Sequence, residues 1–145
     1  MNTQKVIFAV HDATTYQNLR LIEKKVAERH DTEYLFLNEL FGESLPAADE
    51  HSNSKHAIDY VRHKWVPELD CRTHPGPLWY QIPQQILYDM ISPDIPYYLD
   101  QYLSDADPDL LMCAHDRLPF VKHLLKRLYC RDIPTVALQH GIRNI

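Results

Sequence analysis

The stretch PDLLMCAHDRLPFVKHLLKRLYCRDIPTVALQHG, residues 108–141, has the clearest pattern in the chain. Its first part, residues 108–116, is a continuous apolar run that predicts a buried strand. Apolar side chains at spacings of three and four then predict a helix over residues 118–132. The apolar run in residues 133–141 predicts a second buried strand. A strand, a helix and a strand in this order normally form a unit with two parallel strands.

The first forty residues repeat this arrangement. Residues 5–12 predict a buried strand, residues 14–30 an amphipathic helix, and residues 33–40 a second strand. Either Thr14 or Thr15 could serve as the N-cap of this helix. Continuous apolar strands are typical of a parallel sheet with helices on both faces. We therefore predict a single α/β domain over residues 1–145, with a Rossmann-like, open and mainly parallel sheet.

The middle of the chain is less regular. Residues 42–56 are polar and predict a surface loop, and residues 56–65 favour a short helix over a strand. Three prolines and a glycine in residues 71–83 indicate irregular structure. Residues 83–91 and 93–105 predict helices, each with a proline near its start, where proline is tolerated.

Composition excludes several classes of protein. A formal net charge of −5 argues against a nucleic-acid-binding module, which usually has a concentrated basic face. No apolar run is long enough to span a membrane, and the N-terminus lacks the pattern of a signal peptide, so we expect a cytoplasmic protein. The chain has three glycines and neither glycine-rich phosphate-binding motif. Three cysteines without a CxxC pair predict reduced thiols, with Cys113 in the core.

Polar residues follow three of the predicted strands. Because the carboxyl ends of parallel strands meet at one edge of the sheet, where ligands bind in open α/β folds, we expect these residues to form one site. Carboxylates and imidazoles there could bind a polar ligand or move protons, and an arginine could hold a phosphate. An aspartate after a strand is also a common helix N-cap, so both roles stay open for the two aspartates. The candidate residues are His11, Asp12, His115, Asp116, Gln139, His140, Gly141 and Arg143.

Other candidates have simpler interpretations. A CxxH spacing at Cys71 and His74 has no second ligand pair at the distance of a zinc site, and no metal or cofactor is expected. The histidines at 51, 56 and 63 lie in a polar region, which favours surface positions. Tyr97, Tyr98 and Tyr102 on one predicted helix could pack a core or mark a protein interface, such as that of a homodimer.

Residues 107–144 resemble a segment of the two-domain GT-B type sugar-nucleotide enzymes. This group includes the non-hydrolysing UDP-N-acetylglucosamine 2-epimerases and the glycosyltransferases of surface-polysaccharide synthesis. The shared pattern is a PDL-type strand, a polar turn with His or Asp, a helix, an IP-type strand and a glycine turn. The turn Gln139-His140-Gly141 is similar to the Gln-His-Gly turn of the polysaccharide transferases. At Gln139 the epimerases carry a catalytic carboxylate, so the amide favours transfer over epimerisation.

The resemblance implies an N-terminal, acceptor-side domain of a longer two-domain glycosyltransferase, with the sheet incomplete at its C-terminal end. Its partners would be a nucleotide sugar and a carbohydrate acceptor, and the isolated chain would be inactive. Asp116 or His140 would act as the general base, and the other strand-end residues would bind substrate. The alternative is a stand-alone α/β module that binds a nucleotide or a protein without catalysis. A phosphoacceptor receiver domain fits poorly, because the acidic pair and the lysine that it needs are missing.

Overall fold

The computed structural model describes residues 2–38, 45, 46, 48, 51, 54–57, 95–114 and 119–138. The described elements, in chain order, are β1 (Lys5–Val10), α1 (Ala13–Val26), β2 (Asp31–Phe36), β3 (Ser54–His56), α5 (Ile95–Ala106), β4 (Leu110–Cys113), α6 (Pro119–Cys130) and β5 (Thr135–Ala137).

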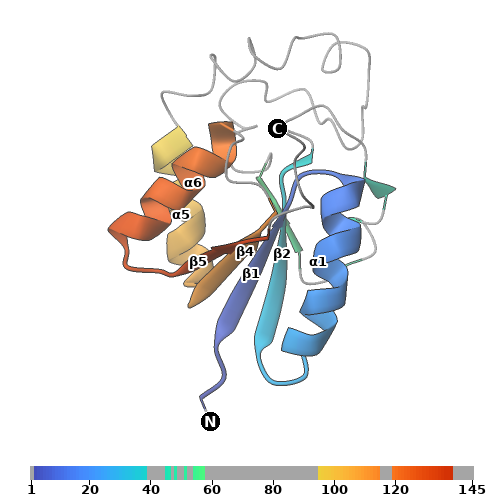
Figure 1. Ribbon diagram of the computed structural model, residues 1–145. Coiled ribbons are helices and arrows are strands. Elements are labelled where there is room, and N and C mark those ends of the chain that lie inside the picture. Colours follow the sequence, from blue (N-terminus) through green and yellow to red (C-terminus); the bar gives the residue numbers. More distant parts are fainter. Residues whose placement is uncertain are drawn as a thin grey trace, which may run out of the picture.

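The described strands form one parallel sheet with the order β3-β2-β1-β4-β5 (Figure 1). The chain builds outward from β1 to β3 and then crosses to the other side of β1 to begin β4. Val6 pairs with Thr32 on one side and with Leu110 on the other, so β1 is the central strand. This confirms the predicted Rossmann-like α/β fold, and it places the reversal of strand order between β1 and β4.

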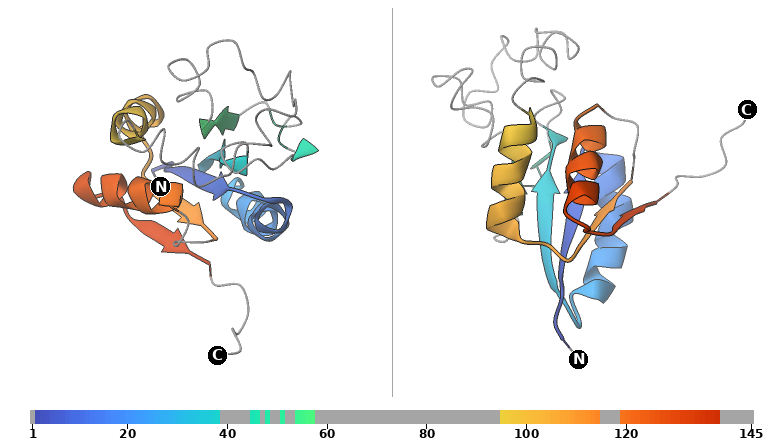
Figure 2. Two further views of the ribbon diagram at one scale, coloured as in Figure 1. Left: turned by 90° about the horizontal axis from the view of Figure 1, so that it is seen from above. Right: turned by 90° about the vertical axis from the view of Figure 1, so that its left-hand side faces the viewer.

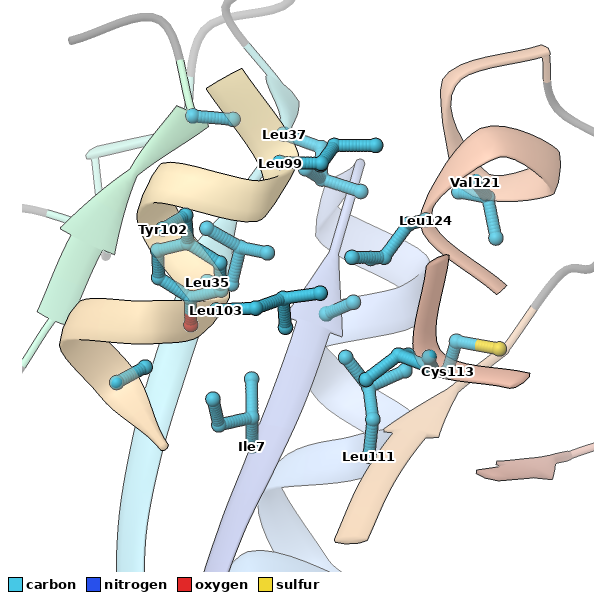
Figure 3. Close-up of a cluster of buried hydrophobic side chains, with 14 of the residues drawn as sticks. Ile7, Leu35, Leu37, Leu99, Tyr102, Leu103, Leu111, Cys113, Val121 and Leu124 are labelled. Atoms are coloured by element: carbon cyan, nitrogen blue, oxygen red, sulfur yellow. The ribbon is translucent and has the colours of Figure 1, made fainter. Parts of the chain in front are cut away.

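Helices cover both faces of the sheet. Helix α1 lies on one face, and α5 and α6 lie together on the other, which gives three layers (Figures 1 and 2). Alternate side chains of β1 enter the two resulting cores, so Ile7 packs on the α5–α6 side and Phe8 on the α1 side. Figure 3 shows the first of these cores, in which Leu103 and Leu124 from the two helices meet Ile7 and Leu111 from the sheet.

Helix α1 begins at a polar cap. Asp12 is the N-cap, with an extended backbone (φ −152°, ψ 176°), and its side chain accepts a hydrogen bond from the backbone N–H of Thr15. The N-cap role that the sequence left open for Asp12 is therefore confirmed, and the alternative caps Thr14 and Thr15 were wrong, because both residues already lie within the helix. Lys24 and Lys25 in the last turn complement the negative end of the helix dipole.

Helices α5 and α6 are joined by an arginine–carboxylate pair. Arg127 donates from Nε to Oδ1 of Asp100 at 2.9 Å and from an Nη atom to Oδ2 at 2.6 Å. These hydrogen bonds raise the pKa of the guanidinium. The two side chains are about one-third exposed, so solvent screening limits the pair to about 1 kcal/mol at most.

Both helices end without glycine. Asp107, just after α5, and Asp132, just after α6, have positive φ angles of 46° and 56°. The N–H of Asp107 donates to the carbonyl of Leu103, and that of Ile133 donates to the carbonyl of Leu128. Aspartate tolerates the left-handed conformation better than most residues, which allows a chain with three glycines to end its helices in this way.

The predicted helices over 93–105 and 118–132 are confirmed by α5 and α6, and Cys113 is buried as expected. The predicted loop at 42–56 was wrong at its end, because residues 54–56 form β3 beside β2. The helix predicted at 56–65 starts one residue too early, since His56 closes that strand and Ala57 is helical; residues 58–65, with His63, lie outside the described residues. The predictions for residues 71–83 and 83–91 lie outside the described residues.

Of the three α5 tyrosines that were suggested to mark a protein interface, only one is exposed enough to contact a partner. Tyr98 and Tyr102 are buried in the core, whereas Tyr97 is exposed. None of the helices in the described part of the chain combines the length and the apolar character needed to cross a bilayer.

Candidate functional site

The carboxyl edge of the sheet, beside the reversal of strand order, is where ligands bind in open α/β folds. His11 and Asp12 directly follow β1 at this edge, and Ala114 follows the neighbouring strand β4. The structure therefore places these two predicted residues where the strand-end rule expects a site. The other predicted residues lie outside the described residues: His115, Asp116, Gln139, His140, Gly141 and Arg143.

The His11 ring is held by two side chains. Its Nε2 lies 3.2 Å from Oδ2 of Asp12, and Thr15 Oγ1 lies 3.2 Å from Nδ1 and 3.3 Å from Nε2. Asp12 also accepts the backbone N–H of Thr15 through Oδ1 at 2.7 Å. One carboxylate thus caps α1 and orients the imidazole at the same time.

Burial differs along this group of side chains. The residue Thr15 is 1% exposed, while the side chains of His11 and Asp12 are 12% and 32% exposed. The Thr15 hydroxyl therefore lies inside the protein, and the Asp12 carboxylate and the His11 imidazole are the parts of this group nearest the solvent. Such a pair can accept and donate hydrogen bonds to a polar ligand.

The charge at this edge disfavours a phosphate next to β1. Rossmann-type phosphate sites use glycines and the free N–H groups at the start of the first helix. Here the corresponding stretch, Val10 to Thr14, contains no glycine, and the Asp12 carboxylate already complements the positive end of the α1 dipole. A phosphate at the same place would meet a negative charge, so hydroxyl groups suit this part of the edge better.

Sequence reasoning missed two polar residues near the same edge. Asn38 follows β2 and His56 ends β3, and both are buried. His56 was predicted to lie on the surface, which is wrong: it is 8% exposed, with its ring 5.3 Å from that of Phe36. A three-residue strand is too short to produce an alternating pattern, so the sequence carries little signal for it.

His51 was also predicted at the surface and is instead packed among aromatic rings. Its Nε2 lies 2.7 Å from the hydroxyl of Tyr16, and its ring centroid is 4.7 Å from that of Tyr34. Phe36 completes the group at 6.2 Å. These contacts fasten residue 51 to α1 and β2, which is a structural role.

Tyr34 belongs to the same group and is buried. Burial raises the pKa of its hydroxyl, and the nearby Glu23 carboxylate raises it further. The hydroxyl lies 3.4 Å from Glu23 Oε2, and Thr32 donates to Oε1 of the same carboxylate at 2.6 Å. The group links α1 to β2 through polar side chains.

No cluster of three or more histidine, cysteine, aspartate or glutamate side chains suited to a metal ion occurs among the described residues. Comparisons of the chain with protein-family models, with curated proteins and with solved structures found no match. The class of the protein therefore rests on the fold and on the residues at the carboxyl edge.

Proposed function

We propose that this chain is the N-terminal, acceptor-side domain of a GT-B type glycosyltransferase that acts in surface-polysaccharide or glycoconjugate synthesis. The proposed donor is a nucleotide sugar and the proposed acceptor is a carbohydrate. The general base is Asp116 or His140, and His11 and Asp12 contact the acceptor. Gln139, His115, Gly141 and Arg143 contribute further substrate contacts.

The observation that carries this proposal is the His11–Asp12 pair at the end of the central strand. It lies beside the reversal of strand order, at the usual ligand position of the fold. The acidic cap makes this end of β1 a poor phosphate site and a suitable hydroxyl site. This combination suits a domain that receives an acceptor sugar while another domain holds the nucleotide. The Gln-His-Gly motif at 139–141 adds independent support from the sequence.

The first step of the test is the mass of the native protein, detected in its own cell with an antibody against this chain. The proposal expects a species well above 17.1 kDa, because the donor-binding domain must be attached. A native species of 17.1 kDa, with no second subunit that copurifies, would contradict it.

The second step is an assay of that native form for sugar transfer from nucleotide-sugar donors. Asp116→Ala and His140→Ala are compared with the parent, and Asp105→Ala, an exposed residue on α5, is the control. Loss of a general base typically lowers the rate by ~10²-fold or more, so one of the two variants should show that loss. Rates within twofold of the parent for both variants would refute the assignment of the base.

A further inference from the structure

Strand β5 is an edge strand of the described sheet, and its three residues are all exposed. It pairs with β4 on one side, and no other described strand lies on its far side. Exposed edges pair readily with other strands, so folded proteins usually protect them with lysine, proline or a bulge. The opposite edge of the described sheet, β3, carries Lys55, whereas the three residues of β5 carry no charge. Strand β5 is therefore the less protected edge.

The hydrogen bonds to β4 show which backbone groups of β5 face away from the sheet. The carbonyl of Pro134 accepts a hydrogen bond from the N–H of Leu111. The N–H of Leu138 donates to the carbonyl of Cys113. Backbone groups of alternate residues point to the same side of a strand, so those of Val136 also face β4. The N–H and C=O groups of the two residues that flank Val136 therefore point to the outer edge.

These outward groups are arranged symmetrically about Val136. Thr135 and Ala137 each offer one N–H and one C=O, with Val136 between them. Two such strands in antiparallel orientation can pair Thr135 of each copy with Ala137 of the other, and each pair then exchanges two hydrogen bonds. The two-fold axis passes between the two Val136 residues, which form the non-hydrogen-bonded pair of the ladder. A strand with this symmetry is complementary to its own copy, as the interface of a two-fold dimer must be.

Apolar side chains surround this axis on the α1 side of the sheet. Val136 is 39% exposed and pairs in register with Met112, which belongs to the core under α1. Leu110 and Leu138 pack against the same core and are only partly buried. An antiparallel pair of β5 strands brings the two Val136 side chains together at the closest spacing in the ladder. The pairing therefore removes apolar surface from water, which favours association.

Helix α6 adds an exposed aromatic side chain beside the same edge. The helix lies between α5 and β5 (Figure 2). Arg127 faces α5 through its pair with Asp100, and Leu128 lies in the core. The helical repeat turns the next residue, Tyr129, to the flank away from α5, where it is 82% exposed. A continuous sheet places the α6 helices of the two copies side by side on one face, so Tyr129 is available for contact between them.

We propose that β5 is the interface of a homodimer, in which two copies of the chain pair antiparallel through residues 135–137 with the two-fold axis at Val136. The two described sheets then form one continuous sheet. The antiparallel arrangement directs the carboxyl edges of the two copies in opposite directions, so the two His11–Asp12 pairs stay separate. The assembly does not depend on the proposed sugar transfer, and its test is the oligomeric state.

Association is measured by analytical ultracentrifugation of the 145-residue chain over a series of concentrations. The parent should reach twice the monomer mass of 17.1 kDa. Val136→Lys places like charges directly opposite each other and should raise the Kd of the dimer roughly tenfold or more. Leu21→Lys also replaces an exposed apolar side chain with lysine, so it is the matched control and should leave the Kd unchanged. A monomer at every concentration, or an equal Kd in Val136→Lys and the parent, would overturn the proposal.

A second variant tests the backbone hydrogen bonds of the edge. Ala137→Pro removes an N–H that faces away from β4, and edge strands tolerate proline at such positions. The change removes one donor from each copy, so two of the four hydrogen bonds are lost and the Kd should rise roughly tenfold or more. Circular dichroism checks that each variant is folded. An unchanged Kd in folded Ala137→Pro would overturn the pairing of the two edges.

The register is tested by disulfide trapping in the 145-residue chain and in the native form. Cys71 and Cys130 are first replaced by serine, and the buried Cys113 is retained. The Cα atoms of a non-hydrogen-bonded antiparallel pair lie about 4.5 Å apart, which is within the range for a disulfide. Val136→Cys should therefore form a covalent dimer on mild oxidation. Thr135→Cys should do so more slowly, because positions 135 of the two copies are not opposite each other.

Two results of the trapping experiment would contradict the proposal. The first is the absence of a covalent dimer in Val136→Cys, or equal rates of cross-linking in Val136→Cys and Thr135→Cys. The second is a covalent dimer in the 145-residue chain but not in a longer native form. That result would show that another segment covers β5 in the native protein, and the second copy would be ruled out as its partner.

Discussion

Strands β1 and β5 look alike in the sequence and differ in the folded chain. Both belong to continuous apolar runs next to a polar turn, and both were predicted to be buried. Five residues of β1, Val6 to Val10, are buried, and Phe8 is 0% exposed. All three residues of β5 are exposed, with Val136 at 39%. The prediction of a buried final strand was therefore wrong.

The difference comes from position in the sheet. β1 pairs with β2 and β4 and is covered by helices on both faces, whereas β5 pairs with β4 at the edge of the described sheet. An apolar run thus indicates that a strand forms, but its neighbours determine how far it is buried. An exposed sheet edge can also pair with another strand, so the exposure of β5 at the edge of the described sheet makes it a possible site of association.

The largest expected effect tests this comparison directly. Phe8→Ala should lower the free energy of unfolding by about 3–5 kcal/mol, because it leaves a cavity in a closed core. Val136→Ala should lower it by less than about 1 kcal/mol, because the site is open to solvent. Urea unfolding followed by circular dichroism measures both. Equal losses of unfolding free energy in the two variants would show that β5 is buried in solution, and would contradict the difference in burial between the two strands.

The next largest effect is the pH dependence of stability caused by Tyr34, a polar residue on the buried strand β2. Burial raises the pKa of Tyr34 above its ordinary value of 10.0, so its contribution to stability is fully present below pH 10. As the pH rises further, the tyrosine ionises in the unfolded chain first. The free energy of unfolding should then fall by up to about 1.4 kcal/mol per pH unit.

Tyr34→Phe removes this alkaline loss, which is measured as the difference in urea unfolding between pH 9 and pH 11. Tyr97→Phe, a change at an exposed tyrosine, is the matched control and should retain the profile of the parent. An unchanged alkaline slope in Tyr34→Phe would contradict the assignment of the slope to the buried hydroxyl.

The smallest effect concerns the polar end of β1, where the core strand passes into the candidate site. Asp12→Ala should cost ~1 kcal/mol of stability through loss of the helix cap, while Asp12→Asn should stay within about 0.5 kcal/mol of the parent. Thermal unfolding of the three proteins is a sufficient measurement. Equal losses in the two variants would show that the charge near His11, and not the cap, is the stabilising feature.

Part of the site could be predicted from the sequence and part could not. His11 and Asp12 were found because polar residues after a buried strand mark the ligand edge of a parallel sheet. The Thr15–His11 contact was missed, because two adjacent threonines look equivalent until the start of the helix is known. His56 was missed because its burial depends on β3 pairing with β2, which a three-residue strand does not signal.

Local chemistry in the sequence determined which segments became helices and strands. The spacing of Val121, Leu124 and Leu128 is enough to define the buried face of α6, because it follows from the helical repeat alone. Strand order, burial and the geometry of the His11 site were decided only by the tertiary structure. They depend on pairings such as that of Val6 with Leu110, and on a hydrogen bond from the Lys5 N–H to the Asp109 side chain. Residues about a hundred positions apart meet there, and no local pattern specifies which distant strand becomes the neighbour.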